Sequence, residues 1–337
     1  MTKNWKNNHQ PTRPIIGLAL GSGSARGWAH IGVINELEQI SVVPDIICGT
    51  SIGALVGGIY LAGQLDTLRD WLLQLERKEI IKYLDIRLLS GGGFVEGTRL
   101  MEFFHRQIGD LNIEDLPKPY TCVATDLESG REIWFQKGPL LDAIRASIAL
   151  PGIFTPVHLN DRWLVDGGLV NPVPVSLCRA LGAELVIAVN LNQDALNRHS
   201  GPLRYVKEPE DNDDNDGSVE GSLLQRISEE LKQRADALVS QLIVPKPKIP
   251  TPGLFDVLAG SIAIMQDRLT RSRMAGDPPD ILLTPRVAHI GLLEFDRAAE
   301  AIDAGRHSVT SMLPAINCLV SAVCPLNDNH INGNHTT

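Results

Sequence analysis

Residues 46–54 read IICGTSIGA, and they place a Gly-x-Ser-x-Gly motif between two different sequence patterns. An apolar run ends at Cys48, and the small-residue run from Ile52 to Ala62 is typical of a tightly packed helix. A serine on a sharp turn between a buried strand and a helix is the context of a nucleophile elbow. We therefore predict that Ser51 is a nucleophile on such a turn, although a chain with 30 glycines leaves an ordinary glycine-rich turn open.

The surrounding sequence repeats this order of strand, turn and helix. The run from Ile15 to Leu20 precedes a glycine loop and a helical pattern that includes Ile31, Ile34 and Leu37. Residues 46–65 are uncharged and near the length of a membrane span, but their glycines favour a buried strand, turn and helix. Further strands are predicted at residues 120–125, 132–135, 162–165, 185–190 and 280–284. Strands that alternate with helices predict an α/β fold with a largely parallel sheet covered on both faces.

A second motif, GSGSARG at residues 21–27, follows the first strand and opens a helix. Such a loop leaves backbone N–H groups free to face an anion, either a phosphate or an oxyanion. Its G-x-G-x-x-x-G spacing differs from that of a dinucleotide-binding loop, and Asp45 begins the next strand instead of ending it. A phosphate-binding P-loop would need a lysine where Trp28 stands. Both nucleotide-binding alternatives are therefore disfavoured.

A third motif, Asp166-Gly167-Gly168, forms a predicted turn after the short hydrophobic strand at residues 162–165. An activated serine needs a neighbouring group that takes its proton, and the residues alone leave both a carboxylate and a histidine open. A triad in the usual order needs a histidine late in the fold, for which the only candidates are His289 and His307. His158 is a remoter candidate because it lies close to Asp166 in sequence.

The overall composition argues against polyanionic partners. Lys and Arg total 31 against 40 Asp and Glu, a net charge of -9, so long-range attraction to phosphate backbones is not expected. The five cysteines are scattered and odd in number, which fits reduced thiols better than a disulfide framework or a zinc site. The polar N-terminus is not followed by an apolar signal segment. We therefore expect no nucleic-acid partner, no metal and a cytoplasmic location.

The layout of the chain predicts one catalytic domain at residues 15–312, between a flexible tail at 1–14 and a C-terminal tail at 313–337. An acidic, disordered insertion at about 195–222 and a helical, lid-like segment at about 223–275 interrupt this domain. Within it, helical patterns are predicted at 223–242, 254–274 and 295–312. Ordinary core packing of the first two helices is the alternative to a lid or a membrane contact.

Four blocks in this order, residues 21–27, 49–53, 146–151 and 166–168, resemble the patatin-like phospholipase family, specifically its small bacterial branch. The resemblance implies a three-layer α/β/α fold with a mostly parallel central sheet and no cofactor. It also implies a dyad without histidine, in which Ser51 is the nucleophile and Asp166 is the general base. Block 146–151 would shape the wall around the dyad. Support of the elbow and the turn would come from Gly49, Gly53, Gly167 and Gly168, and the oxyanion hole from Gly21, Gly23, Ser24, Ala25 and Arg26.

The reaction that follows from this resemblance is acyl transfer from a lipid or simpler ester substrate through an acyl-enzyme. Phospholipase A, lysophospholipase and carboxylesterase activities all fit, and peripheral contact with the inner face of a membrane is compatible with each. Two alternatives are a lipid-binding or regulatory module of the same fold with little activity, and a Ser-His-Asp esterase of the α/β-hydrolase type. The sequence leaves the oligomeric state open.

Overall fold

The computed structural model describes residues 13–75, 96–193 and 254–323. The chain divides into two units, residues 1–200 together with 258–337, and residues 201–257. The first unit contains the sheet, and the second is described only where one helix begins at Leu254. The predicted acidic insertion and the predicted helix at 223–242 lie outside the described residues.

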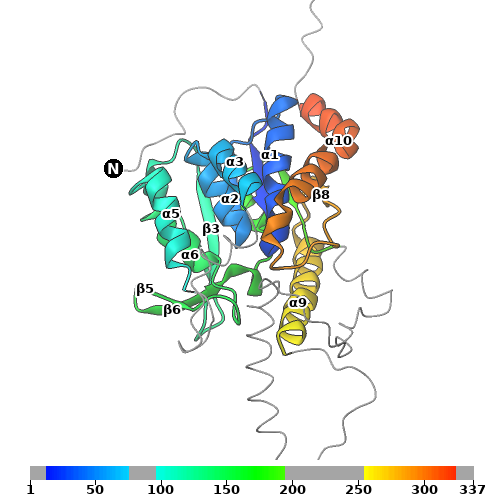
Figure 1. Cartoon of the computed structure of the whole chain (residues 1–337). Helices are drawn as coiled ribbons and strands as arrows, with labels where there is room; N and C mark the ends of the chain where they lie inside the picture. Colours follow the sequence, from blue (N-terminus) through cyan, green and yellow to red (C-terminus); the bar gives the residue numbers. More distant parts are fainter. Residues whose placement is uncertain (1–12, 76–95, 194–253, 324–337) are drawn as a thin grey trace, which may run out of the picture. The chain divides into compact units, whose positions relative to one another are not determined.

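The first unit is built on an eight-stranded sheet (Figure 1). The strand order is β5-β6-β3-β2-β1-β7-β8, and β4 pairs with β3 beside this path. Strands β3, β2, β1, β7 and β8 are joined by parallel pairing, whereas β4, β6 and β5 are added by antiparallel pairing. The strands span β1 Ile16–Leu20, β2 Ile46–Thr50, β3 Tyr120–Asp126, β4 Glu132–Phe135, β5 Val157–Leu159, β6 Arg162–Asp166, β7 Leu185–Val189 and β8 Ile281–Leu283. The prediction of a mostly parallel sheet is confirmed.

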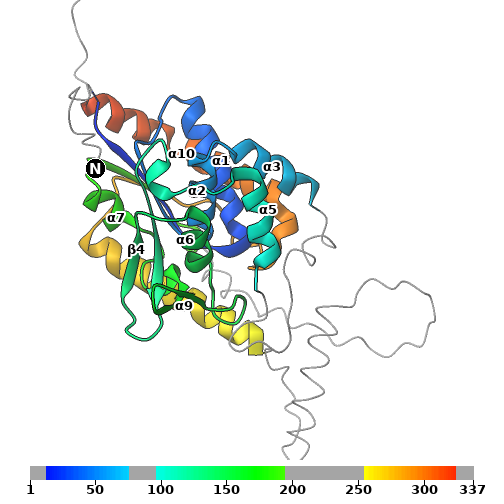
Figure 2. The same cartoon turned by 90° about the vertical axis from the view of Figure 1, so that its left-hand side faces the viewer.

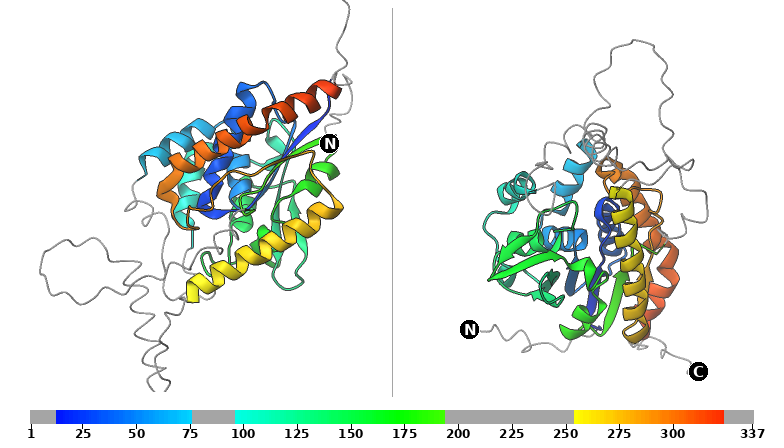
Figure 3. Two further views of the ribbon diagram at one scale, coloured as in Figure 1. Left: turned by 90° about the vertical axis from the view of Figure 1, so that its right-hand side faces the viewer. Right: turned by 90° about the horizontal axis from the view of Figure 1, so that it is seen from below.

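Helices cover both faces of this sheet, which gives three layers (Figures 2 and 3). One face carries α1, α2, α3, α5, α6 and α10, and the other carries α7 and α9. The main helices span α1 Ala29–Gln39, α2 Ile52–Leu61, α3 Leu65–Gln74, α5 Thr98–Ile108, α6 Leu140–Ser147, α7 Val175–Ala180, α9 Leu254–Gly276 and α10 Ala298–Val323. Short 3-10 helices are η1 Ser24–Trp28, η2 Ile113–Asp115, η3 Gly167–Leu169 and η5 Phe295–Arg297. The fold is therefore the three-layer α/β/α arrangement that the sequence predicted.

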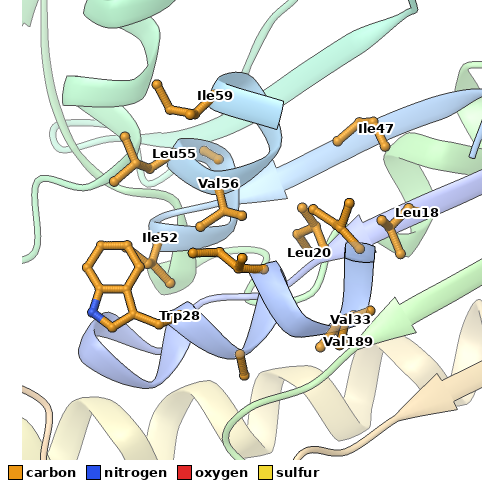
Figure 4. Close-up of a cluster of buried hydrophobic side chains, with 14 of the residues drawn as sticks. Leu18, Leu20, Trp28, Val33, Ile47, Ile52, Leu55, Val56, Ile59 and Val189 are labelled. Atoms are coloured by element: carbon orange, nitrogen blue, oxygen red, sulfur yellow. The ribbon is translucent and has the colours of Figure 1, made fainter. Parts of the chain in front are cut away.

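The hydrophobic core lies on both sides of the sheet because alternate residues of each strand face opposite layers. In β1, Leu18 and Leu20 belong to the larger cluster, whereas Ala19 belongs to the smaller cluster under α7. Figure 4 shows side chains of the larger cluster, in which strand residues face residues from α1 and α2. The uncharged stretch at 46–65 is thus the buried strand, turn and helix that was predicted. No helix within the described ranges is long and apolar enough to cross a membrane.

Helix α10 packs across α1 at very short range, because a glycine lies at each side of the crossing. A Cβ at Gly32 would lie 1.9 Å from the carbonyl oxygen of Ile302, and one at Gly305 would lie 2.0 Å from that of Ala29. The sequence predicted that this last helix ends at Met312, whereas it continues to Val323 with Pro314 inside it. The predicted boundary at 312 was therefore wrong for this helix.

Candidate active site

The Gly-x-Ser-x-Gly motif forms the turn between β2 and α2, and Ser51 sits at its tip. Ser51 has φ 57° and ψ -123°, a conformation that a non-glycine residue holds only at a cost of about 1–3 kcal/mol. The two flanking positions must be glycine because no side chain fits there. A Cβ at Gly49 would lie 2.5 Å from the backbone nitrogen of Ala54, and one at Gly53 would lie 2.2 Å from the carbonyl oxygen of Leu20. This strand–turn–helix geometry is that of a nucleophile elbow.

A hydroxyl from another helix holds the strained backbone of the elbow. The backbone N–H of Ser51 donates to Oγ of Ser147, the last residue of α6, at 2.9 Å, and Ser147 is fully buried. Burial makes this acceptor important, because an unpaired buried N–H costs about 1–3 kcal/mol. The contact ties Ser51 to α6.

The register of the sheet brings Asp166 next to Ser51. Thr50, which precedes Ser51, pairs with Val123 on one edge of β3, and Asp166 pairs with Ala124 on the other edge. The two residues therefore flank the same point of β3 although they come from strands of opposite direction. The Ser51 hydroxyl donates to Oδ2 of Asp166 at 2.5 Å.

Three further hydrogen bonds fix Asp166 and its turn. The N–H of Gly168 donates to Oδ1 of Asp166 at 2.7 Å, and Oγ1 of Thr125 donates to the carbonyl oxygen of Asp166 at 2.8 Å. The N–H of Asp166 donates to the carbonyl oxygen of Ala149 at 2.9 Å. At Gly167 a Cβ would lie 2.2 Å from the carbonyl oxygen of Val123, so this glycine allows the turn to pass close to β3.

The carboxyl of Asp166 is almost completely buried, with 1% of its surface exposed. Burial raises the pKa of Asp166 from its ordinary 3.8 to about 7, because the charged form loses its hydration. The hydrogen bonds from Ser51 and Gly168 oppose this rise, since both stabilise the carboxylate. A carboxyl with a pKa near 7 can accept a proton from a serine and return it at neutral pH.

The glycine loop at residues 21–27 differs in detail from the predicted oxyanion hole. Amides of three of the five predicted residues are already hydrogen-bonded within the protein, so they are not available to an oxyanion. These bonds run from Gly21 to Val189, from Ala25 to Leu292 and from Arg26 to Gly23, each to the carbonyl oxygen. Arg26 instead orders the loop, because its Nε donates to the carbonyl oxygen of Ile290 at 2.8 Å.

Two amides of the loop remain available. Within the described part of the chain, the N–H groups of Gly23 and Ser24 donate to no other group. Ser24 has φ 52°, and its hydroxyl donates to the carbonyl oxygen of Leu292 at 2.6 Å, which holds this unusual backbone in place. Ser24 also lines the same pocket as Ser51. Of the five residues predicted to form the oxyanion hole, only Gly23 and Ser24 thus have an amide available among the described residues.

An apolar pocket opens beside Ser51. Its empty volume, counting the part open to solvent, is about 700 Å³. Apart from the hydroxyls of Ser24 and Ser51, the wall is formed by apolar and aromatic side chains. They are Trp28, Ile52, Leu55, Trp71, Leu72, Leu75, Leu100, Ile148, Leu150, Ile153, Phe154 and Phe295. Such a wall suits a hydrocarbon chain, because it offers burial of apolar surface and almost no hydrogen bonds.

The predicted histidine candidates lie elsewhere. His289 binds Glu300 and His307 binds Asp303 on the surface, where 52% and 71% of their side chains are exposed. The exposed ring of His158 packs against Trp163. Within residues 13–75, 96–193 and 254–323, no histidine is hydrogen-bonded to Ser51 or Asp166. The same ranges contain no group of three or more His, Cys, Asp or Glu side chains that could hold a metal ion.

Sequence reasoning missed two hydroxyls that act on the backbone of the site, those of Ser147 and Thr125. Ser147 lies in the block at 146–151, which was expected only to shape the wall. Its position in that block was a usable signal, since a buried serine at a helix end needs a hydrogen-bond partner. Thr125 carries no such signal, because threonine is common in strands.

Comparison with known proteins identifies the family of this chain. The model for patatin-like phospholipases matches residues 18–179, which include both Ser51 and Asp166. An uncharacterized NTE family protein of Mycobacterium tuberculosis is 36% identical over 337 residues, covering 90% of this chain and 92% of that protein. A lysophospholipase of Emericella nidulans is 25% identical over 305 residues, covering 86% of this chain and 17% of that protein. The chain belongs to the patatin-like phospholipase family of lipid-ester hydrolases.

Proposed function

We propose that the protein hydrolyses carboxylic esters of lipids with Ser51 as nucleophile and Asp166 as general base. The observation that carries this proposal is the hydrogen bond of 2.5 Å from the Ser51 hydroxyl to Oδ2 of Asp166, at the wall of an apolar pocket. A base within hydrogen-bond reach of a serine on an elbow is the arrangement that activates a hydroxyl for acyl transfer.

The reaction has two halves that use the same pair of residues. Ser51 Oγ forms a bond to the ester carbonyl carbon while its proton moves to Oδ2 of Asp166. The tetrahedral intermediate then collapses, the bond to the alcohol oxygen breaks, and Asp166 returns the proton to the leaving alcohol. Water attacks the acyl-enzyme, gives a proton to Asp166 and releases the fatty acid, after which Ser51 regains its proton.

The amides of Gly23 and Ser24 are the proposed donors to the oxyanion. Each donor of this kind is typically worth about 3–4 kcal/mol of transition-state stabilisation. Ser51 also precedes the first turn of α2, whose free N–H groups favour negative charge near the serine. The loop and the helix start are held close together, because a Cβ at Gly27 would lie 2.2 Å from Cγ2 of Ile52.

The apolar pocket favours substrates with a hydrocarbon chain next to the ester. None of the described residues that line it has a charged side chain, so we expect the head group of a phospholipid to lie outside this pocket. The fungal relative bears the name lysophospholipase, which is a reason to include single-chain phospholipids among the substrates tested. Phospholipids, lysophospholipids and simple medium-chain esters are the proposed substrate set.

The test compares wild type, Ser51→Ala and Asp166→Asn on medium-chain p-nitrophenyl esters, a phospholipid and a lysophospholipid, with folding of each protein checked by circular dichroism. We expect kcat to fall at least about a thousandfold in both variants. His289→Ala is the control and should keep wild-type activity, because its side chain lies on the surface. An Asp166→Asn variant of near-normal activity would place the base elsewhere, and an inert wild type would favour a lipid-binding module.

A further inference from the structure

Helix α9 carries three buried polar side chains, Gln266, Asp267 and Thr270, with 6%, 2% and 2% of their surface exposed. Two of them form hydrogen bonds with residues of the same helix. Thr270 Oγ1 donates to the carbonyl oxygen of Gln266 at 2.7 Å, and Oδ2 of Asp267 accepts from Nε of Arg271 at 2.8 Å. The side chain of Gln266 instead leaves the helix toward the active site, so its burial needs another explanation.

The carboxamide oxygen of Gln266 is held by two donors from different segments. Oε1 accepts from Oγ of Ser22 at 3.2 Å and from Nδ2 of Asn192 at 3.1 Å. Ser22 directly precedes the loop amides available to an oxyanion, and Asn192 follows strand β7. Because both donors bind the oxygen, the NH2 group of the same carboxamide faces the other way.

The NH2 side of Gln266 meets the turn that carries Asp166. A Cβ at Gly168 would lie 2.4 Å from Nε2 of Gln266, 2.9 Å from Oδ1 of Asp166 and 3.2 Å from Cβ of Ser22. The carboxamide therefore packs on the α-carbon of the residue whose N–H binds Asp166. Nε2 finds no acceptor of its own among the residues that the structure describes.

We propose that Gln266 is a positioning residue for Asp166: its carboxamide, held by Ser22 and Asn192, keeps the turn at Gly168 in place. The inference rests on the proposed roles of Ser51 and Asp166. A buried side chain fixed at one end and packed on a glycine at the other stops the turn from moving away from the serine. Holding the turn in place also keeps the hydrogen bond from the N–H of Gly168 to Oδ1 of Asp166, which favours the ionised form of the carboxyl.

No charged side chain competes with this effect in the described part of the site. On the elements packed around the turn, the titratable neighbours Asp267 of α9 and Asp126 of β3 are paired with Arg271 and Arg162. The pKa of Asp166 is set by burial and by two neutral hydrogen-bond donors. Loss of the Gln266 contact would let the turn at Gly168 move and weaken its bond to Oδ1, so the pKa of Asp166 would rise.

The test is Gln266→Met, which keeps length and volume and removes the amide. We expect kcat on a p-nitrophenyl ester to fall by roughly ten- to a hundredfold, because a misplaced catalytic group costs on that order. KM should change little, because Gln266 does not line the apolar pocket. The acid limb of kcat/KM against pH should move to higher pH, which a loss of folded protein alone would not cause.

Thr270→Val is the matched control, because Thr270 is buried on the same helix and its hydroxyl donates to a carbonyl oxygen of that helix. It should leave kcat and the acid limb unchanged. If Gln266→Met does not fold, kcat and the acid limb are measured on Asn192→Ala instead, which removes one donor to Oε1 of Gln266. Wild-type kcat and an unmoved acid limb in the folded variant would overturn the inference. An active Asp166→Asn would instead overturn the proposed function, so the two failures are distinguishable.

Discussion

At the scale of single residues, the site depends on one carboxyl kept away from water. Asp166 is 1% exposed, and its pKa of about 7 lies well above that of an ordinary aspartate. In the proposed reaction, Asp166 must be ionised to accept the proton of Ser51. We predict that kcat/KM falls about tenfold for each unit of pH below about 7, because only the ionised fraction of free enzyme reacts.

The measurement is kcat/KM on a p-nitrophenyl ester from pH 5 to 9, with the release of product followed in a way that does not depend on pH. Enzyme returned to pH 8 after each assay should regain full activity, which separates titration from acid unfolding. An acid limb near pH 4 would contradict the prediction, since it would mean that the catalytic carboxyl is hydrated.

Ser147 allows a second prediction at this scale. Ser147→Ala removes the acceptor for the N–H of Ser51 and leaves a buried N–H on a residue with φ 57°. We expect a loss of about 1–3 kcal/mol in the free energy of unfolding. We also expect kcat to fall by roughly ten- to a hundredfold, since Ser51, the proposed nucleophile, loses its position.

Ser308→Ala is the control for Ser147→Ala, because the hydroxyl of Ser308 donates only to the carbonyl oxygen of Gly305 in its own helix. Urea unfolding and steady-state kinetics on both variants give the two quantities. A Ser147→Ala protein with wild-type kcat would show that the elbow holds its conformation without this hydroxyl.

At the scale of elements, the crossing of α1 and α10 depends on two glycines. Gly305→Ala or Gly32→Ala would place a methyl group about 2 Å from a carbonyl oxygen of the opposite helix, so the helices must separate. We predict a loss of about 2–4 kcal/mol for either change, because α10 would lose close packing along α1.

The matched control is Gly260→Ala in α9, where a Cβ would meet nothing within 4 Å. This change should stabilise the protein by up to about 1 kcal/mol, because alanine has the higher helix propensity. Thermal and urea unfolding of the three variants test the comparison. Equal stability of Gly305→Ala and Gly260→Ala would show that the crossing tolerates a wider separation.

The elements that the sequence predicted well are those with a strong local pattern. The predicted strand at 132–135 matches β4, and the run at 52–62 differs from α2 by one residue at its end. Strand β5, Val157–Leu159, was missed because it is short and only half-buried, so it lacks an apolar signature. The predicted last helix ends at Met312, two residues before Pro314, whereas α10 continues through this proline to Val323.

In the site, too, local sequence patterns predict single residues but not their contacts with residues distant in sequence. Ser51 and Asp166 each stand in a short motif, and the pairing of two strands with β3 brings them together. Gln266 stands in an ordinary helical pattern 100 positions beyond Asp166, so no neighbouring residue marks its contact with the turn. Which loop amides stay free also depends on partners distant in sequence, such as Val189 for Gly21 and Leu292 for Ala25.

At the scale of the whole molecule, the buried carboxyl lowers stability at neutral pH. An aspartate whose folded pKa is raised prefers to stay protonated in the folded state. As pH rises from about 4 to about 7, the unfolded chain ionises first, so folding stability is progressively lost. Asp166→Asn removes this penalty and keeps an acceptor for the N–H of Gly168.

We therefore predict that Asp166→Asn is more stable than wild type at pH 8 by up to about 4 kcal/mol, since each unit of pKa difference is worth about 1.4 kcal/mol. The gain should become small near pH 4, where the wild-type carboxyl is protonated in the folded state and is losing its charge in the unfolded state. Urea unfolding of both proteins at pH 4, 6 and 8 measures it. A gain that does not change with pH would mean that Asp166 is not the group responsible.

The placement of Ser51 and Asp166 on either edge of β3 also bears on how the protein folds. Thr50 must pair with Val123, and Ala124 with Asp166, before the two side chains can meet. Both are pairings between distant parts of the chain, and such contacts form late because a long loop must close first. Recovery of esterase activity during refolding should thus lag behind the return of helical signal. Activity would therefore report the completion of the sheet, because Ser51 and Asp166 meet only after both strand pairings have formed.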